Sequence, residues 1–456
     1  MNSNVKVIMH CLKHSEKPNI KSLYEEEFEK NKNIIEVIKA GKCSNMLGWK
    51  CLTINQEEIV KDIISYSETA KTEFDDFVVL GVGGSALGAK TIFNTLCPLT
   101  YNYLSKEQRK GPRVFIIDNI DPIEIDEILN FVNLKKTLVN VVSKSGTTTE
   151  SMAQFLTFYD RIKKEVGEKE VDKHFVFTTD KENGVLCRIA LEKDIKTFPI
   201  NAGVGGRFSV LSPVGLLPAC MMGVNIVELL NGAREMQMEC ESCAEQNPAY
   251  KKAITEYALN KKGVNMVVTM PYSSKLKEYS YWYAQLLGES IGKELDRDGN
   301  KKNYGLTPVS ALGATDQHSQ LQLYMEGPED KLLVFIKVRE FAKKVMCESN
   351  PFGSDLEHLK GVEFGNLINA ERQSTLCGLA HNGMPFIELS IESINASCLG
   401  QLFMLSMYEI AFLGELYNVD AYNQPGVEFG KKATLATLGV EKYAQFLNSC
   451  AVIDEE

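Results

Sequence analysis

Metal-binding and disulfide patterns are sparse in this sequence. The six histidines lie far apart and form no HxH or HExxH cluster. Of the twelve cysteines, only Cys240 and Cys243 form a CxxC pair, and no second pair or HxxxH motif completes a zinc site. The cysteines are scattered over a long chain, which favours free thiols in a reducing cytoplasm over a disulfide framework. We therefore predict a cytoplasmic protein with no metal site.

The chain also lacks a basic tract and a long apolar run free of polar residues. Its formal net charge of −10 argues against nucleic acid as a partner, because phosphate backbones need a basic face. The N-terminal stretch "MNSNVKVIMHCLKHSEK" lacks the basic-then-apolar order of a signal peptide. The most apolar run, residues 397–417, includes Gln401, Glu409 and Glu415. We expect it to be a buried core helix rather than a membrane span.

Short apolar runs of strand length alternate with helical patterns along the chain. This alternation is typical of parallel βαβ units with right-handed crossovers. The glycine-rich residues 201–209 interrupt it and form a candidate hinge, and a helix is expected over residues 426–447. With 456 residues, the chain is long enough for two α/β units. The expected strands are residues 77–80, 113–118, 137–142, 174–179 and 196–200 in the first unit, and 264–270, 332–338 and 385–391 in the second.

The first glycine-rich loop follows a predicted strand in "VVLGVGGSALGAK". Gly81, Gly83 and Ala86 satisfy the G-x-G-x-x-A fingerprint of dinucleotide-binding proteins, and Asp118 ends the next strand, where a ribose-binding acid could lie. By itself the pattern is weak, because a tight turn needs glycine for backbone reasons alone. An NAD-dependent oxidoreductase is one open interpretation of this loop.

A second loop, "VVSKSGTTTES", also follows an apolar strand and opens a helix. Hydroxyl groups and backbone N–H groups at a helix N-terminus form a compact anion site, which suits a terminal phosphate. Capping the helix would need only one Ser or Thr. Ser85 of the first loop can join the same site, because both loops leave the carboxyl ends of strands. The loop side chains are Ser143, Lys144, Ser145, Thr147 and Thr148.

Four long segments in this order resemble the phosphoglucose isomerase family, in its compact bacterial form. They are "VGGRFSVLSPVG" (204–215), "GESIGKE" (288–294), "GATDQHSQLQLYMEG" (313–327) and "LYNVDAYNQPGVEFGKK" (416–432). The resemblance implies reversible isomerisation of D-glucose 6-phosphate and D-fructose 6-phosphate in glycolysis and gluconeogenesis, with no metal and no cofactor. An oxidoreductase and a non-catalytic sugar-phosphate-binding protein are the alternatives, although no basic recognition segment favours a regulator.

The resemblance also implies a fold of two sugar-isomerase (SIS) domains, each an α-β-α sandwich with a parallel sheet. We predict a first SIS domain over residues 1–200, which carries both phosphate loops. The second SIS domain is expected over residues 201–415, and a helical C-terminal segment over residues 416–456.

Four residues correspond to the catalytic groups of the family. Glu289 resembles the base that moves a proton between C1 and C2, and Arg207 resembles the group that stabilises the cis-enediolate. His318 and Lys431 resemble the groups that open the sugar ring. From the residues alone, Glu289 could be an exposed carboxylate at a helix end, Arg207 an interdomain ion pair and His318 a surface side chain.

Further positions match the family's phosphate pocket. Ala86 stands where the family commonly has an acidic residue, so sugar contacts on that side are less certain. Gly84 and Gly206 are expected in the loops beside the substrate. The phosphate-binding residues implied by the resemblance are Ser85, Ser143, Lys144, Ser145, Thr148, Gln285 and Gln424.

The resemblance implies a homodimer with shared active sites and leaves a higher oligomer open. In such a dimer, His318 reaches the pocket of the partner subunit. Glu289, Arg207 and the phosphate loops then belong to the home subunit.

Overall fold

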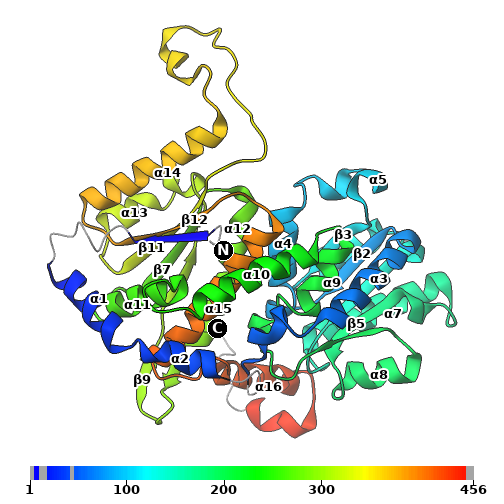
Figure 1. Cartoon of the computed structure of the whole chain (residues 1–456). Coiled ribbons are helices and arrows are strands. Elements are labelled where there is room, and N and C mark those ends of the chain that lie inside the picture. Colours follow the sequence, from blue (N-terminus) through cyan, green and yellow to red (C-terminus); the bar gives the residue numbers. More distant parts are fainter. Residues whose placement is uncertain (1–4, 10–17, 42–45, 448–456) are drawn as a thin grey trace, which may run out of the picture.

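The computed structural model describes residues 5–9, 18–41 and 46–447, with two five-stranded sheets side by side (Figure 1). Helices flank both sheets, and two long helices, α10 and α15, pack against each other in the middle of the molecule. The α-helices are α1 Pro18–Lys30, α2 Asn33–Ala40, α3 Glu57–Glu73, α4 Leu87–Leu96, α5 Lys106–Arg109, α6 Pro122–Phe131, α7 Thr149–Val166, α8 Val185–Lys193, α9 Pro213–Met221, α10 Ile226–Cys240, α11 Pro248–Asn260, α12 Lys277–Ile291, α13 Leu321–Glu326, α14 Phe364–His381, α15 Ala396–Leu416 and α16 Glu428–Thr437.

The first sheet is entirely parallel, with the strand order β3-β2-β4-β5-β6. Every residue of β2 and β4 is buried, which explains why most of their residues are apolar. The five strands predicted for this part of the chain are confirmed, each end within one residue. Their bounds are β2 Asp76–Leu80, β3 Arg113–Ile117, β4 Thr137–Val142, β5 Phe175–Asp180 and β6 Thr197–Ile200.

The second sheet has the order β1-β12-β11-β7-β10, and only its edge strand β1 is antiparallel to its neighbour. The three predicted strands are confirmed as β7, β11 and β12. The sequence interpretation missed the edge strands β1 and β10, and a two-stranded hairpin of β8 and β9. The bounds are β1 Val5–Met9, β7 Met266–Pro271, β8 Lys293–Leu295, β9 Lys301–Tyr304, β10 Thr307–Ser310, β11 Lys331–Val338 and β12 Phe386–Ile391.

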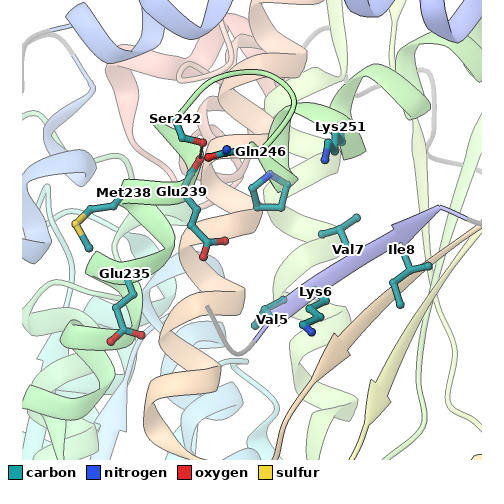
Figure 2. A pocket seen from close by; sticks show the side chains of 11 residues that line it. Val5, Lys6, Val7, Ile8, Glu235, Met238, Glu239, Ser242, Gln246 and Lys251 are labelled. Carbon is teal, nitrogen blue, oxygen red and sulfur yellow. Dashed lines mark hydrogen bonds between the residues drawn. The ribbon is translucent and has the colours of Figure 1, made fainter. Parts of the chain in front are cut away.

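The N-terminal strand crosses the predicted domain boundary. β1 lies within residues 1–200 but pairs with β12 of the second sheet. Beside β1, the helix α10 and the start of α11 border a cavity of about 920 Å³, in which Lys6 and Lys251 lie opposite Glu235 and Glu239 (Figure 2). The division at residue 200 stays a prediction, but the first strand belongs to the second sheet.

The apolar run near the C-terminus forms α15, which is long and apolar enough to cross a membrane. In the structure, 94% of its most apolar window is buried inside the protein, as predicted for a core helix. Its close packing on α10 depends on glycine, because a Cβ atom on Gly400 would lie 2.0 Å from the Leu229 carbonyl oxygen. A Cβ atom on Gly232 would equally lie 2.0 Å from the Ser397 carbonyl oxygen.

The predicted terminal helix is interrupted. α16 ends at Thr437, and Gly439 follows with a φ of 83°, a left-handed conformation that glycine adopts readily after a helix. A short 3₁₀ helix then covers Glu441–Phe446. The expectation of one continuous helix over residues 426–447 is therefore wrong, because the glycine ends α16.

A fully buried ionic cluster joins α11, α12 and α15. The Lys252 ammonium group donates to Glu256 Oε1 and Glu409 Oε1, both at 2.6 Å, and to the Tyr283 hydroxyl at 2.9 Å. Burial, reinforced by the charge of Glu409, raises the pKa of Glu256 to about 8. The cluster therefore holds one cation and two carboxyl groups in an apolar interior.

Eight of the described cysteines are free, including Cys240 and Cys243. Cys51 is disulfide-bonded, so the expectation of free thiols throughout is wrong at that position. Within the described ranges, no group of three or more His, Cys, Asp and Glu side chains could hold a metal ion.

Candidate active site

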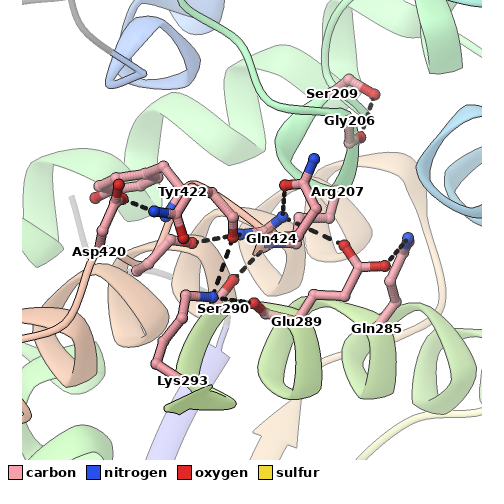
Figure 3. A network of polar contacts seen from close by, with 12 residues as sticks. Gly206, Arg207, Ser209, Gln285, Glu289, Ser290, Lys293, Asp420, Tyr422 and Gln424 are labelled. Carbon is pink, nitrogen blue, oxygen red and sulfur yellow. Dashed lines mark hydrogen bonds and ion pairs between the residues drawn. The ribbon is translucent and has the colours of Figure 1, made fainter. Parts of the chain in front are cut away.

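Arg207 lies at the centre of a polar network that joins three distant segments (Figure 3). Its side chain is 3% exposed and lies in the short 3₁₀ turn Gly206–Phe208. Its Nη2 donates to the carbonyl oxygens of Ala421 and Asn423, at 2.6 and 3.0 Å, and its Nε donates to Ser290 Oγ at 2.7 Å. The guanidinium group is therefore fixed in position before any ligand binds.

The Glu289 carboxylate is held at both oxygens. Arg207 Nη1 donates to Oε2 at 3.3 Å, and Gln285 Nε2, one turn earlier on α12, donates to Oε1 at 3.2 Å. The Glu289 side chain remains 36% exposed, so the carboxylate is both oriented and accessible. This geometry suits a group that exchanges protons with a bound molecule.

The C-terminal segment completes this network. Gln424 Oε1 accepts a hydrogen bond from Arg207 Nη1 at 3.0 Å. Lys293, just after α12, donates to the Asn423 carbonyl at 3.0 Å and to the Glu289 carbonyl. Burial and the nearby Arg207 charge lower the pKa of Lys293 to about 8. The C-terminal segment is thus joined both to Arg207 and, through Lys293, to the end of α12.

The first glycine-rich loop lies directly against the Arg207 turn. A Cβ atom on Gly84 would lie 2.4 Å from the Gly206 carbonyl carbon, so the two backbones touch only because residue 84 is glycine. Ser209 Oγ also donates to the Gly84 carbonyl at 3.3 Å. On the other side of the loop, a Cβ atom on Gly83 would lie 2.9 Å from Gln285 Nε2. The loop that ends at Ser85 is thus adjacent to the Glu289 network.

The second loop leaves the carboxyl end of β4, which pairs with β2. Thr148 is the N-cap residue of α7, but its hydroxyl makes no capping hydrogen bond and instead contacts Ser143 Oγ at 3.0 Å. Lys144 Nζ donates to the carbonyl oxygens of Ala202 and Val204, at 2.6 and 2.8 Å. Helix capping therefore does not explain Thr148, and Lys144 connects this loop to the segment that precedes Arg207.

Two other predicted residues lie apart from this network. His318 is exposed at the end of the short turn Thr315–His318, which follows β10. The Lys431 side chain is 59% exposed and donates to Glu428 Oε1 at 2.7 Å. Among the described contacts of this single chain, none joins either residue to Arg207 or Glu289. Their ring-opening roles stay predictions.

A model of the phosphoglucose isomerase family matches residues 53–450, most of the chain. The chain belongs to this family. It is 44% identical over 419 residues to a glucose-6-phosphate isomerase from Carboxydothermus hydrogenoformans, a match that covers 91% of this chain and 90% of that protein. It is 41% identical over 372 residues to a glucose-6-phosphate isomerase from Rubrobacter xylanophilus, covering 81% and 83% of the two chains.

Two solved structures share the fold of this chain. A hypothetical protein from Thermus thermophilus superposes with a TM-score of 0.85 at 33% identity, over 95% of this chain and 100% of that one. A glucose-6-phosphate isomerase from Chlamydia trachomatis gives a TM-score of 0.81 over 100% of this chain and 93% of that one. At 20% identity, this second match shows the fold alone. The predicted fold of two sugar-isomerase units is confirmed.

For this phosphoglucose isomerase family member, sequence reasoning missed two residues of the network. Ser290 and Lys293 both lie in the "GESIGKE" segment, which was singled out only for Glu289. A serine and a lysine near a helix end usually face solvent, so no local signal marked them. Their burial, 0% and 6% exposed, appears only when the segments around Arg207 and Asn423 pack on α12.

Proposed function

We propose that this protein interconverts D-glucose 6-phosphate and D-fructose 6-phosphate through a cis-enediolate. One observation carries the proposal: an accessible Glu289 carboxylate is held by a buried Arg207 beside two loops of the first sheet. The names of the curated relatives support the same substrates. The family match disfavours the oxidoreductase interpretation of the first glycine loop.

The network supports a proton-transfer mechanism. Glu289 takes the proton from C2 of the aldose and returns it to C1, which a single carboxylate can do without leaving the site. Negative charge develops on the enediolate oxygens, and the Arg207 guanidinium is already fixed next to the carboxylate, 3.3 Å away. A fixed cation stabilises that charge without reorganisation during the reaction.

The two loops provide the phosphate site in this proposal. Ser85, Ser143, Ser145 and Thr148 offer hydroxyl groups near the carboxyl ends of β2 and β4, and α7 begins at residue 149. The positive end of a helix dipole favours an anion at that place. Gln285 and Gln424 border the Glu289 network rather than the loop of residues 143–148. We therefore propose that these two amides contact the sugar and not the phosphate alone.

The test is a coupled assay in which fructose 6-phosphate is supplied and glucose 6-phosphate is detected by an NADP-dependent dehydrogenase. We expect full activity after exhaustive treatment with EDTA. Product formation that requires zinc or manganese would contradict the metal-independent mechanism. Binding of the sugar phosphate without turnover would instead indicate the non-catalytic alternative, and reduction of NAD without the coupling enzyme would indicate an oxidoreductase.

The hydroxyl loop is expected to act on substrate binding. Thr148→Ala and Lys144→Ala should each raise KM several-fold, because each removes a contact made in both the ground state and the transition state. Lys144→Ala should also lower kcat, since Lys144 holds the carbonyls of residues 202 and 204 before Arg207. Thr157→Ala, on an exposed part of the same helix, is the matched control. An unchanged KM in a stable Thr148→Ala variant would assign the loop a structural role.

We also propose that the active site is shared across a homodimer, with His318 supplied by the partner subunit. In one chain, His318 is exposed and makes no described contact with the Glu289 network, which fits a role in a second subunit. The proposed division of residues has a direct consequence for mixed dimers.

Inactive Glu289→Gln and His318→Ala chains, refolded together, should regain activity. If the site is shared, one site of each mixed dimer carries both lesions and the other carries neither. About half of randomly assembled dimers are mixed, so activity should approach roughly a quarter of the wild-type value. Each variant refolded alone is the control. A mixture that stays inactive although mixed dimers form would contradict the shared site and leave the isomerase proposal intact.

A further inference from the structure

The strand order of the first sheet explains where its loops meet. The chain runs from β2 to β3 on one side, and from β4 to β5 on the other. Between β2 and β4 the two connections diverge, and parallel sheets bind ligands in the crevice at such a point. Both loops of the candidate active site leave the sheet there, after β2 and after β4.

The second sheet has a point of the same kind. From β7 the chain reaches β10 on one side, and from β11 it reaches β12 on the other, so the connections diverge between β7 and β11. None of the residues assigned to the isomerase reaction lies in the loops that follow these two strands. The fold therefore contains a second crevice whose loops carry none of the residues assigned to the proposed reaction.

A cavity of about 730 Å³ lies at this second crevice. Loops after β7, β11 and β12 line one side, and the end of α4 and the start of α10 line the other. In Figure 1, α4 and α10 lie between the two sheets, so the cavity is bordered by both halves of the molecule. Its volume is within the range of small-molecule sites. We call it the second-crevice cavity.

Lys275 supplies a cation to the second-crevice cavity. It is half-buried, and no carboxylate of the described residues lies within ion-pair distance of it. Its ammonium group donates to the Cys97 carbonyl, which leaves two of its three protons without a described partner. The carboxylates that border the cavity, Glu228 and Glu340, are both exposed, and Arg109 and Lys343 add further positive charge. The cavity therefore favours an anion.

Thr95 supplies a second polar group at the wall of the cavity. It lines the cavity from the end of α4 and is 2% exposed, yet its hydroxyl has no hydrogen-bond partner among the described residues. A buried hydroxyl without a partner is costly, and such groups are usually satisfied by a bound molecule or water. The N-termini of α10 and α15, capped by Asn225 and Asn395, also border the cavity and add the positive ends of two long helices.

We propose that the second-crevice cavity binds a small organic phosphate, distinct from the sugar phosphate at the Glu289 site. Lys275, Ser273 and the N-terminus of α15 all line the cavity, and we assign the phosphate group to them. The mostly apolar remainder of the cavity receives the organic part. Because both halves of the molecule border the cavity, an occupant connects them and stabilises the folded chain.

Phenyl phosphate is the probe, because it combines a phosphate with an apolar body. Calorimetric titration of the full chain should show a binding event that persists in Thr148→Ala, and a crystal soaked with the probe should show it beside Lys275. Lys275→Met should weaken this event by roughly tenfold or more, the usual effect of losing one charged contact. Lys277→Met, two residues further on and exposed, should bind like wild type.

Thr95→Val keeps the shape of its side chain and tests the same site without removing a charge. It should weaken the probe about two- to tenfold while the melting temperature of the ligand-free protein stays the same or rises. KM and kcat for fructose 6-phosphate should change less than about twofold in both cavity variants, since neither residue borders Glu289. Probe density only at the first-sheet loops, or equal affinity in wild type and Lys275→Met, would overturn the proposal.

Discussion

Glu289→Gln is expected to lower turnover of fructose 6-phosphate by about 10²–10⁴-fold, the usual contribution of one acid–base group. The amide keeps the size of the side chain and an oxygen that can accept from Arg207 or Gln285, but it has no basic lone pair. Arg207 retains its bonds to Ser290 and to the C-terminal segment, so the fold should be unaffected. KM should change little, because the phosphate provides most of the ground-state binding.

Steady-state kinetics and a thermal melt of the same sample check this expectation. Glu294→Gln, an exposed carboxylate five residues further on, is the matched control and should behave like wild type. A turnover within threefold of wild type in a folded Glu289→Gln protein would remove Glu289 from the role of base. A large loss of stability would instead show that the ion pair with Arg207 is structural.

Lys252→Met is expected to lower the free energy of unfolding by about 3–5 kcal/mol, although it lies outside the catalytic network. It removes the single cation of the buried cluster and leaves Glu256 and Glu409 without their charged partner. Negative charge that stays in the apolar interior must then be neutralised by a proton or stabilised by water that enters. Urea unfolding at constant pH measures the loss. Lys262→Met, at an exposed lysine just after the same helix, is the matched control and should leave the free energy of unfolding nearly unchanged. A loss below about 1 kcal/mol would contradict the importance of the cluster.

Glu256→Gln separates charge from packing in the same cluster. Its folded-state pKa of about 8 lies above its usual value of 4.5, so the folded state binds this proton more tightly than the unfolded state. The resulting stability is fully present below pH 4.5 and is lost as the pH rises through about 8. Glu256→Gln should flatten this part of the stability–pH curve and should lose less stability than Lys252→Met. An unchanged slope between pH 5 and 8 would contradict the raised pKa.

The central strands could be predicted from the sequence because strands buried on both faces consist mostly of apolar residues. Residues 137–142 are apolar nearly throughout, and they form β4 with every residue buried. β10, with the sequence "TPVS", has no such apolar run, because it is a short edge strand. β1 pairs with β12 across more than 370 residues, and no local pattern indicates that partner.

In the candidate site, too, some features could be predicted from the sequence and others could not. Both loops were recognisable because glycine and hydroxyl residues gathered directly after apolar strands. The network itself depends on contacts between distant positions: Arg207 is 82 residues from Glu289 and 217 residues from Gln424. The family motifs identified these residues individually, but the contacts between them are set by the fold. Ser290 and Lys293 acquired their roles only through burial.

Short-range pattern and residue identity were enough to predict the α/β class, the central strands, the two loops and the family resemblance. Three features came from the folded chain alone: β1 joins the second sheet, Arg207 orients Glu289, and a second crevice lies beyond β7 and β11. The physical reason is the packing of segments that are remote in sequence. Burial, hydrogen-bond partners and pKa shifts belong to the assembled interior and have no counterpart in the isolated segments.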